Sequence, residues 1–146
     1  MTERQLEVLY RRFLLELWTA DLDVVDGLAA ELAGSDFVIH QARMDGRPSE
    51  GVRGPAALSG LVRQGREPFT EVTTRIDAGP LVDGDGVAAR WTLTGRYRGG
   101  VEGATAPAGT TVSLSGLDLM RARDGRFVEY WVSSDVMPMM RQLGMG

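Results

Sequence analysis

One carboxylate in this sequence stands where proton-transfer chemistry would place it. Asp118 lies in the middle of a strand-like run, residues 113–120, between Leu117 and Leu119. Strand interiors disfavour Asp, and a buried charge needs a partner or a shifted pKa. From the pattern alone, Asp118 either faces solvent, pairs with a neighbouring Arg, or projects into an apolar pocket as an acid or base.

The second candidate proton carrier is His40, the one histidine of the chain. It ends a short strand-like segment, residues 36–40. An imidazole titrates close to neutral pH, which suits acid–base catalysis. A histidine at a strand end can also simply satisfy a backbone carbonyl, so both interpretations of His40 stay open.

The composition excludes several other chemistries. The chain has no Cys, and all 16 of its basic residues are Arg, so cysteine nucleophiles, thiolate metal sites and lysine Schiff bases are excluded. The net charge of −4 and the dispersed arginines argue against a nucleic-acid partner. We predict that the protein uses no metal ion and no organic cofactor.

The length and the N-terminus indicate one cytoplasmic domain. A chain of 146 residues, 43% of them hydrophobic, suits a single domain over residues 1–146. No apolar run approaches the roughly 20 residues of a membrane span. The charged N-terminus lacks the apolar segment and cleavage site of a signal peptide. We therefore expect a cytoplasmic protein without membrane contact.

The predicted elements place helices first and strands later. Helical spacing of apolar residues predicts a helix of about four turns near the N-terminus, a second from Asp21 to Gly34, and a third that starts at Gly54-Pro55. A polar loop, residues 41–53, separates the last two. Strands are predicted over residues 36–40, 69–76 with a possible extension to 82, 87–97, 110–123 and 126–135, before a short helix at 136–143. This order is typical of an α+β protein.

Strand alternation predicts which side chains share a face. On the first strand of the hairpin turning at Asp124-Gly125, it groups Leu114, Gly116, Asp118 and Met120. On the second strand it groups Glu129, Trp131, Ser133 and Asp135. Arg90, if it points inward, leaves Trp91 and Leu93 outside and pairs with Glu129 or Asp118.

Residues 87–95, 115–121 and 124–131, followed by Asp135, resemble the SnoaL-like polyketide cyclases in sequence and order. Residues 36–40 and 142–144 match the same family. The resemblance implies a cone-shaped α+β barrel, in which N-terminal helices and a curved antiparallel sheet enclose an apolar cavity. It also implies a homodimer that pairs through the sheet.

The resemblance extends to individual positions. An Asp on a Gly-x-Asp strand is the acid and base of an intramolecular aldol closure in these cyclases, and Asp118 matches it. His40 of this chain matches the position of the catalytic base in the related ketosteroid isomerases, and Phe13 lies near the position of their oxyanion-binding tyrosine. Because Phe13 lacks the tyrosine hydroxyl, isomerase activity is not expected. Epoxide hydrolases of the same fold use an Arg and two Asp residues. This chain has Arg90 at the position of the Arg, but it lacks both carboxylates, so the resemblance does not imply that mechanism.

These features predict a cofactor-independent cyclase, of lyase or isomerase type, that acts on a hydrophobic polyketide in antibiotic biosynthesis. Its predicted catalytic residues are Asp118 and His40. Its predicted substrate-binding residues are Arg90, Tyr10, Phe13, Trp18, Leu114, Met120, Trp131, Ser133 and Met137. Two alternatives remain: a pericyclic cyclase whose pocket shape alone folds a polyene, and a non-catalytic protein that binds a small ligand.

Overall fold

The structure is a computed structural model and describes residues 1–41 and 51–145. Its helices are α1 (Glu3–Arg11), α2 (Val25–Leu32), α3 (Pro55–Arg66) and α4 (Val136–Gln142). Its strands are β1 (Ala33–His40), β2 (Phe69–Asp83), β3 (Gly86–Tyr97), β4 (Thr111–Arg123) and β5 (Arg126–Ser134). A π-helix, η1 (Arg12–Leu17), continues α1, and a 3-10 turn, η2 (Leu22–Val24), precedes α2. The predicted order of helices and strands is confirmed.

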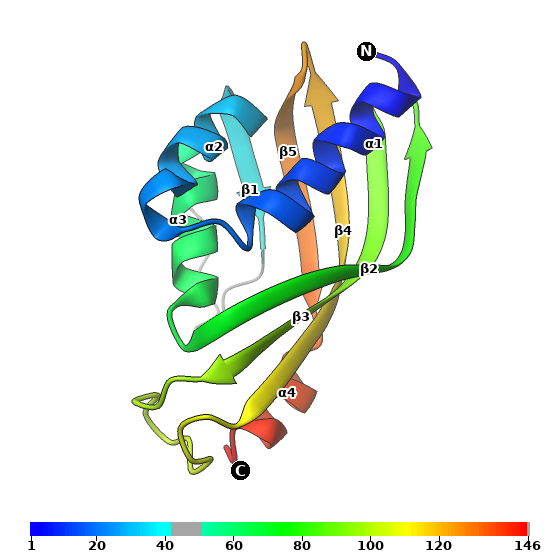
Figure 1. Cartoon of the computed structure of the whole chain (residues 1–146). Coiled ribbons are helices and arrows are strands. Elements are labelled where there is room, and N and C mark those ends of the chain that lie inside the picture. The colour runs from blue at the N-terminus through cyan, green and yellow to red at the C-terminus, as the bar shows by residue number, and fades with distance from the viewer. Residues whose placement is uncertain (42–50, 146) are drawn as a thin grey trace.

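The five strands form one open, curved sheet in the order β1-β5-β4-β3-β2. Strands β2 to β5 are antiparallel neighbours, whereas β1 joins the edge of the sheet parallel to β5. Figure 1 shows α1 crossing the sheet, α2 and α3 beside β1, and α4 at the opposite end. The α+β cone is confirmed, but its sheet is mixed and open, not purely antiparallel or closed.

Local sequence signals determine where several elements begin and turn. The hydroxyl of Thr2 accepts from the backbone of Gln5, whose side chain accepts from the backbone of Thr2, which caps α1. Pro55 starts α3 at its first turn. Asp124 and Gly125 have φ of 54° and 81°, the two positive values of a tight hairpin turn.

The N-terminal helices differ from the prediction in two places. The first predicted helix is an α-helix only as far as Arg11, and it continues as a wider π-helix from Arg12 to Leu17. The second does not extend to Gly34, because Ala33 already pairs with Phe127 of β5. Pairing with a distant strand thus ends α2 earlier than the glycine suggests. Most of the predicted loop 41–53 lies outside the described residues.

The main core lies between the helices and the inner face of the sheet. Its largest fully buried side chains include Tyr10, Tyr130, Phe13, Phe37 and Phe127. A second, smaller cluster joins Phe69, Tyr97, Val112 and Leu143 where α4 packs. Among the described residues, no helix is long and apolar enough to cross a membrane.

Candidate active site

Asp118 is a buried charged residue on β4. It lies at the middle of β4, between Ala89 of β3 and Val132 of β5. Its side chain points to the inner face of the sheet and the residue is 2% exposed. Of the three arrangements that the sequence left open, the structure shows the inward carboxylate.

Three donors from three different elements hold this carboxylate. The Tyr130 hydroxyl donates to Oδ1 across 2.6 Å, and the Trp91 indole N–H donates to the same oxygen across 2.9 Å. The Tyr10 hydroxyl donates to Oδ2 across 2.8 Å. A carboxylate offers about four acceptor positions, so one remains for a further proton or donor.

Burial and hydrogen bonding oppose each other at Asp118. Burial raises the pKa of Asp118 to about 6, while the hydrogen bonds from Tyr130, Tyr10 and Trp91 pull it down. Burial, together with the Asp118 charge, also raises the pKa values of Tyr10 and Tyr130, so both phenols stay protonated as donors. A carboxyl group that titrates close to neutral pH suits proton transfer.

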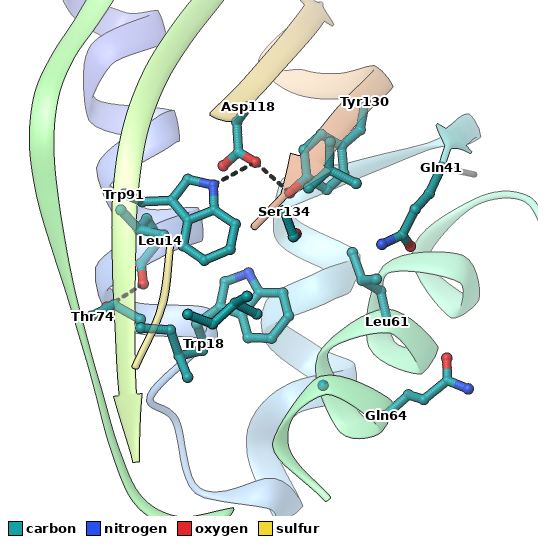
Figure 2. A pocket seen from close by; sticks show the side chains of 14 residues that line it. Leu14, Trp18, Gln41, Leu61, Gln64, Thr74, Trp91, Asp118, Tyr130 and Ser134 are labelled. Carbon is teal, nitrogen blue, oxygen red and sulfur yellow. Dashed lines mark hydrogen bonds between the residues drawn. The ribbon is translucent and has the colours of Figure 1, made fainter. Parts of the chain in front are cut away.

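A cavity of about 190 Å³ opens beside Asp118. Figure 2 shows its walls, which come from η1, α3 and the inner face of the sheet. The lining residues are Leu14, Trp18, Gln41, Leu61, Gln64, Gly65, Thr74, Trp91, Leu93, Leu114, Asp118, Tyr130, Val132 and Ser134. Most of these side chains are apolar, and Asp118 is the only carboxylate among the described lining residues.

The π-helix contributes one wall of this cavity. Leu14 and Trp18 line it from η1 and its C-terminal end. The Thr74 hydroxyl of β2 donates to the Leu14 carbonyl across 2.7 Å, which ties the helix to the sheet. Such π-turns are frequent at functional sites.

Four of the predicted site residues lie at Asp118 or its cavity. Trp18, Leu114 and Asp118 line the cavity, and Tyr10 reaches Asp118 through its hydroxyl. Phe13 and Met120 are fully buried in the core and do not line the cavity.

The other predicted residues lie elsewhere. His40 is on the opposite face of the sheet, where Nε2 lies 3.0 Å from Glu129 Oε2 and the ring stacks on Trp131 at 4.9 Å. The prediction that His40 shares a site with Asp118 is therefore wrong. Arg90 pairs with Asp135 at 2.9 Å and not with Glu129 or Asp118.

Ser133 and Met137 also lie outside the cavity. Ser133 is exposed on β5, and Met137 is 63% exposed on α4. The placement of Trp131 and Ser133 in the pocket is wrong for one reason, an irregularity in the hairpin.

That irregularity is a β-bulge at Val128. Next to the turn, Ala122 pairs with Phe127, but the following residue, Arg121, pairs with Glu129. Val128 is the extra residue on β5. An inserted residue moves all side chains beyond it to the opposite face.

The shifted register decides which side chains of β5 reach the cavity. Without the bulge Asp118 would pair with Trp131, whereas in the structure it pairs with Val132. Tyr130, Val132 and Ser134 consequently line the cavity, and Trp131 faces outward. Sequence alternation found the right strand but the wrong face.

Trp91 is the other important residue that the sequence analysis missed. Ala89 pairs with Asp118 and Trp91 with Gly116, so Trp91 shares the inner face with Asp118. The long connection between β3 and β4 carries no two-residue turn that would set this register. Trp91 was therefore not recognisable as a site residue from alternation alone. Strand alternation also makes no prediction for Gln64, which lies on α3, or for Gln41, which follows β1.

The described residues form no metal site. In residues 1–41 and 51–145, His, Asp and Glu side chains make no cluster able to hold a metal ion.

The fold agrees with the comparisons to known proteins. The sequence profile of the SnoaL-like polyketide cyclases matches residues 8–143. The chain belongs to the SnoaL-like polyketide cyclase family. No curated protein sequence is significantly similar to it.

Several solved structures share the fold. IdmH from Streptomyces antibioticus, a candidate polyketide cyclase, is 28% identical, with 97% of this chain and 96% of that chain covered and a TM-score of 0.72. A candidate SnoaL-like cyclase from Jannaschia sp. is 22% identical, with 99% and 94% covered and a TM-score of 0.79. AclR from Streptomyces galilaeus, a candidate hydroxylase, is 22% identical, with 98% and 83% covered and a TM-score of 0.76. Differently described proteins therefore share this architecture, and function must be argued from the site.

Proposed function

We propose that this protein closes a carbocyclic ring in a polyketide intermediate by intramolecular aldol chemistry, with Asp118 as the acid and base. The observation that carries the proposal is the buried carboxylate at the wall of an apolar cavity, with three hydrogen-bond donors and a pKa raised to about 6. Family membership supports the substrate class.

The proposed reaction begins with proton removal. The Asp118 carboxylate takes a proton from a carbon next to a carbonyl group, and the electron pair of that C–H bond forms an enolate. The donors from Tyr10, Tyr130 and Trp91 hold the carboxylate in one orientation for this transfer. Both phenols remain protonated, so neither competes with Asp118 as the base.

Ring closure follows in the same cavity. The enolate carbon attacks a second carbonyl carbon of the folded chain, which forms the C–C bond and leaves an alkoxide. The Asp118 carboxyl group returns its proton to that oxygen. Substrate and product are then isomers, and subsequent loss of water would make the overall reaction a lyase reaction. In these proposed steps Asp118 both removes and returns the proton.

A purified-enzyme assay with a linear polyketide precursor tests the proposal. Asp118→Asn should lower the rate of ring closure about 10²- to 10⁴-fold, the usual contribution of a positioned general base, while substrate still binds. His40→Gln is the matched control, because His40 lies on the outer face with Glu129. Near-normal turnover in Asp118→Asn would reject the base and favour a pericyclic cyclase, in which the apolar walls alone fold the substrate. Binding without conversion by the wild type would favour a ligand-binding protein.

A further inference from the structure

The proposed reaction needs a donor for the negative oxygen that develops when Asp118 removes the proton. Preorganised N–H or O–H groups in a dry site supply such stabilisation. Tyr130 and Trp91 line the cavity, but their donors are already directed at Asp118. Thr74 donates to the Leu14 carbonyl. The remaining lining residues with side-chain donors are Trp18, Gln41, Gln64 and Ser134.

Trp18 carries a donor that no described residue of the chain accepts. An indole N–H can only donate, so it usually finds a partner when buried. In the part of the chain that the structure describes, no acceptor takes a hydrogen bond from the Trp18 ring, and its nitrogen is not among the buried atoms lacking a partner. The N–H is therefore accessible from the cavity that Trp18 lines.

The nitrogen is turned toward the carboxylate end of that cavity. In Figure 2 the Trp18 ring lies below the Trp91 ring, with its nitrogen on the edge that faces Trp91 and Asp118. The amide of Gln64 is directed away from this end. Asp118 and the Trp18 N–H thus border the same part of the cavity, one as acceptor of a proton and the other as donor of a hydrogen bond.

Packing holds the Trp18 ring in this orientation. Phe13 meets it edge to face, with ring centroids 6.5 Å apart and an interplanar angle of 85°. On the other side the ring lies against Gly65 of α3, where an added Cβ would approach Cζ3 and Cη2 of Trp18 to 2.8 and 2.9 Å. Glycine in a helix lowers stability by about 1 kcal/mol relative to Ala. The close approach of the Trp18 ring explains why position 65 is nevertheless a glycine.

We propose that the indole N–H of Trp18 donates a hydrogen bond to the substrate carbonyl oxygen that becomes the enolate oxygen. This inference rests on the proposed function and adds a second catalytic residue to it. It also restricts the substrate, which must present a ketone oxygen to Trp18 while the adjacent C–H faces Asp118.

A pair of small ligands tests this role without turnover. The probe is 2-tetralone, a bicyclic ketone that accepts but does not donate hydrogen bonds, and its reference is the hydrocarbon tetralin. The chain has three Trp residues, so ¹H–¹⁵N spectra show three indole N–H signals, and Trp18→Phe identifies the one from Trp18. We expect 2-tetralone to move that signal downfield and tetralin to move it much less.

Affinity provides the second readout. Trp18→Phe should weaken 2-tetralone binding about five- to tenfold, the effect of one lost hydrogen bond, and change tetralin binding less than about twofold. Trp131→Phe makes the same substitution on the outer face of the sheet, so it is the matched control and should leave both affinities unchanged. Gly65→Ala keeps the indole but displaces it, so it should also lose the preference for the ketone.

Three results would overturn the inference: no binding of 2-tetralone to the wild type, an unmoved Trp18 signal, or equal losses for both ligands in Trp18→Phe. The last result would make Trp18 an apolar wall only. Failure of the proposed function is distinguishable, because it appears as normal ring closure by Asp118→Asn. In that case a shifted Trp18 signal would still assign carbonyl binding to Trp18.

Discussion

The Tyr130 hydroxyl donates to Asp118 Oδ1 across 2.6 Å, although the two residues are not opposite each other on their strands. Asp118 pairs with Val132, and Tyr130 pairs with Met120. The contact is therefore diagonal, and it exists only because the bulge at Val128 turns Tyr130 inward. One inserted residue gives the buried carboxylate its shortest hydrogen bond.

The pH profile of Tyr130→Phe should report this contact. The hydrogen bond stabilises the Asp118 carboxylate, so its loss should raise the pKa of Asp118 above about 6. Wild-type kcat/KM should rise with pH around 6 as the carboxylate forms. The midpoint of the variant profile should move upward by about one to two pH units, since a hydrogen bond to a charged group is worth about 1.5–3 kcal/mol. Tyr97→Phe, in the second core cluster, should leave the profile in place. An unchanged midpoint in Tyr130→Phe would contradict the role of this bond.

Stability should fall as Asp118 ionises. The pKa of Asp118 is about 6 in the folded protein and 3.8 as its ordinary value. Between these values the folded state binds more protons than the unfolded state, so this contribution is complete below pH 3.8 and is lost as pH rises through 6. The expected loss is on the order of 2–3 kcal/mol.

Urea unfolding of wild type and Asp118→Asn at pH 4.5 and 7.5 isolates this effect. The wild type should lose stability relative to the variant at the higher pH. Hydrogen bonds from neighbours lower the pKa values of exposed carboxylates such as Asp77 and Asp85. These groups change the free energy of unfolding with the opposite sign, but they do so equally in both proteins, so their effect cancels when the variant is compared with the wild type. A constant difference between the two proteins would show that Asp118 titrates with an ordinary pKa.

Gly116 should tolerate no side chain. An added Cβ would lie 2.5 Å from Trp91 Cζ2 and 2.7 Å from the Ser133 carbonyl. Gly116→Ala should therefore displace the Trp91 ring and destabilise the protein by about 1–3 kcal/mol, the range for an overpacked core. Gly27→Ala is the control, because nothing lies within 4 Å and the residue is helical, so it should stabilise by about 0.5–1 kcal/mol. Equal stabilities of both variants in urea unfolding would reject this packing.

The outer face of the sheet should mediate a homodimer. Leu117 and Leu119 are 53% and 46% exposed there, and Leu119 pairs with Trp131. Exposed apolar groups that gather in one place are typical of interfaces, and the family resemblance implies a dimer that pairs through the sheet. Sedimentation velocity should give a dimer for the wild type, a monomer for Leu119→Glu, and a dimer for Leu81→Glu on the β2 edge strand. A wild-type monomer at micromolar concentration would refute the prediction.

Much of the architecture was predictable because its signals are local. Helical spacing, Pro55 after Gly54, and Asp124-Gly125 each specify an element or turn through short-range chemistry. Asp118 stood out for a similar reason, since a carboxylate in an apolar strand conflicts with strand propensity.

The partners of Asp118 were not predictable, because they depend on long-range register. A two-residue turn alone would place Trp131 opposite Asp118, and nothing in the sequence marks Val128 as the bulge. The inward direction of Trp91 depends on a β3–β4 pairing closed by a long connection. His40 looked catalytic as the single histidine at a strand end, but β1 turns it to the outer face, against Glu129.

The most direct test of Asp118 as a base is proton exchange in deuterated water. The wild type should accelerate exchange of the C–H next to the carbonyl of 2-tetralone, followed by NMR. Asp118→Asn should lose this acceleration at least about 100-fold, within the range for a general base, and His40→Gln should retain it. Equal exchange rates in the wild type and Asp118→Asn would contradict proton transfer by Asp118.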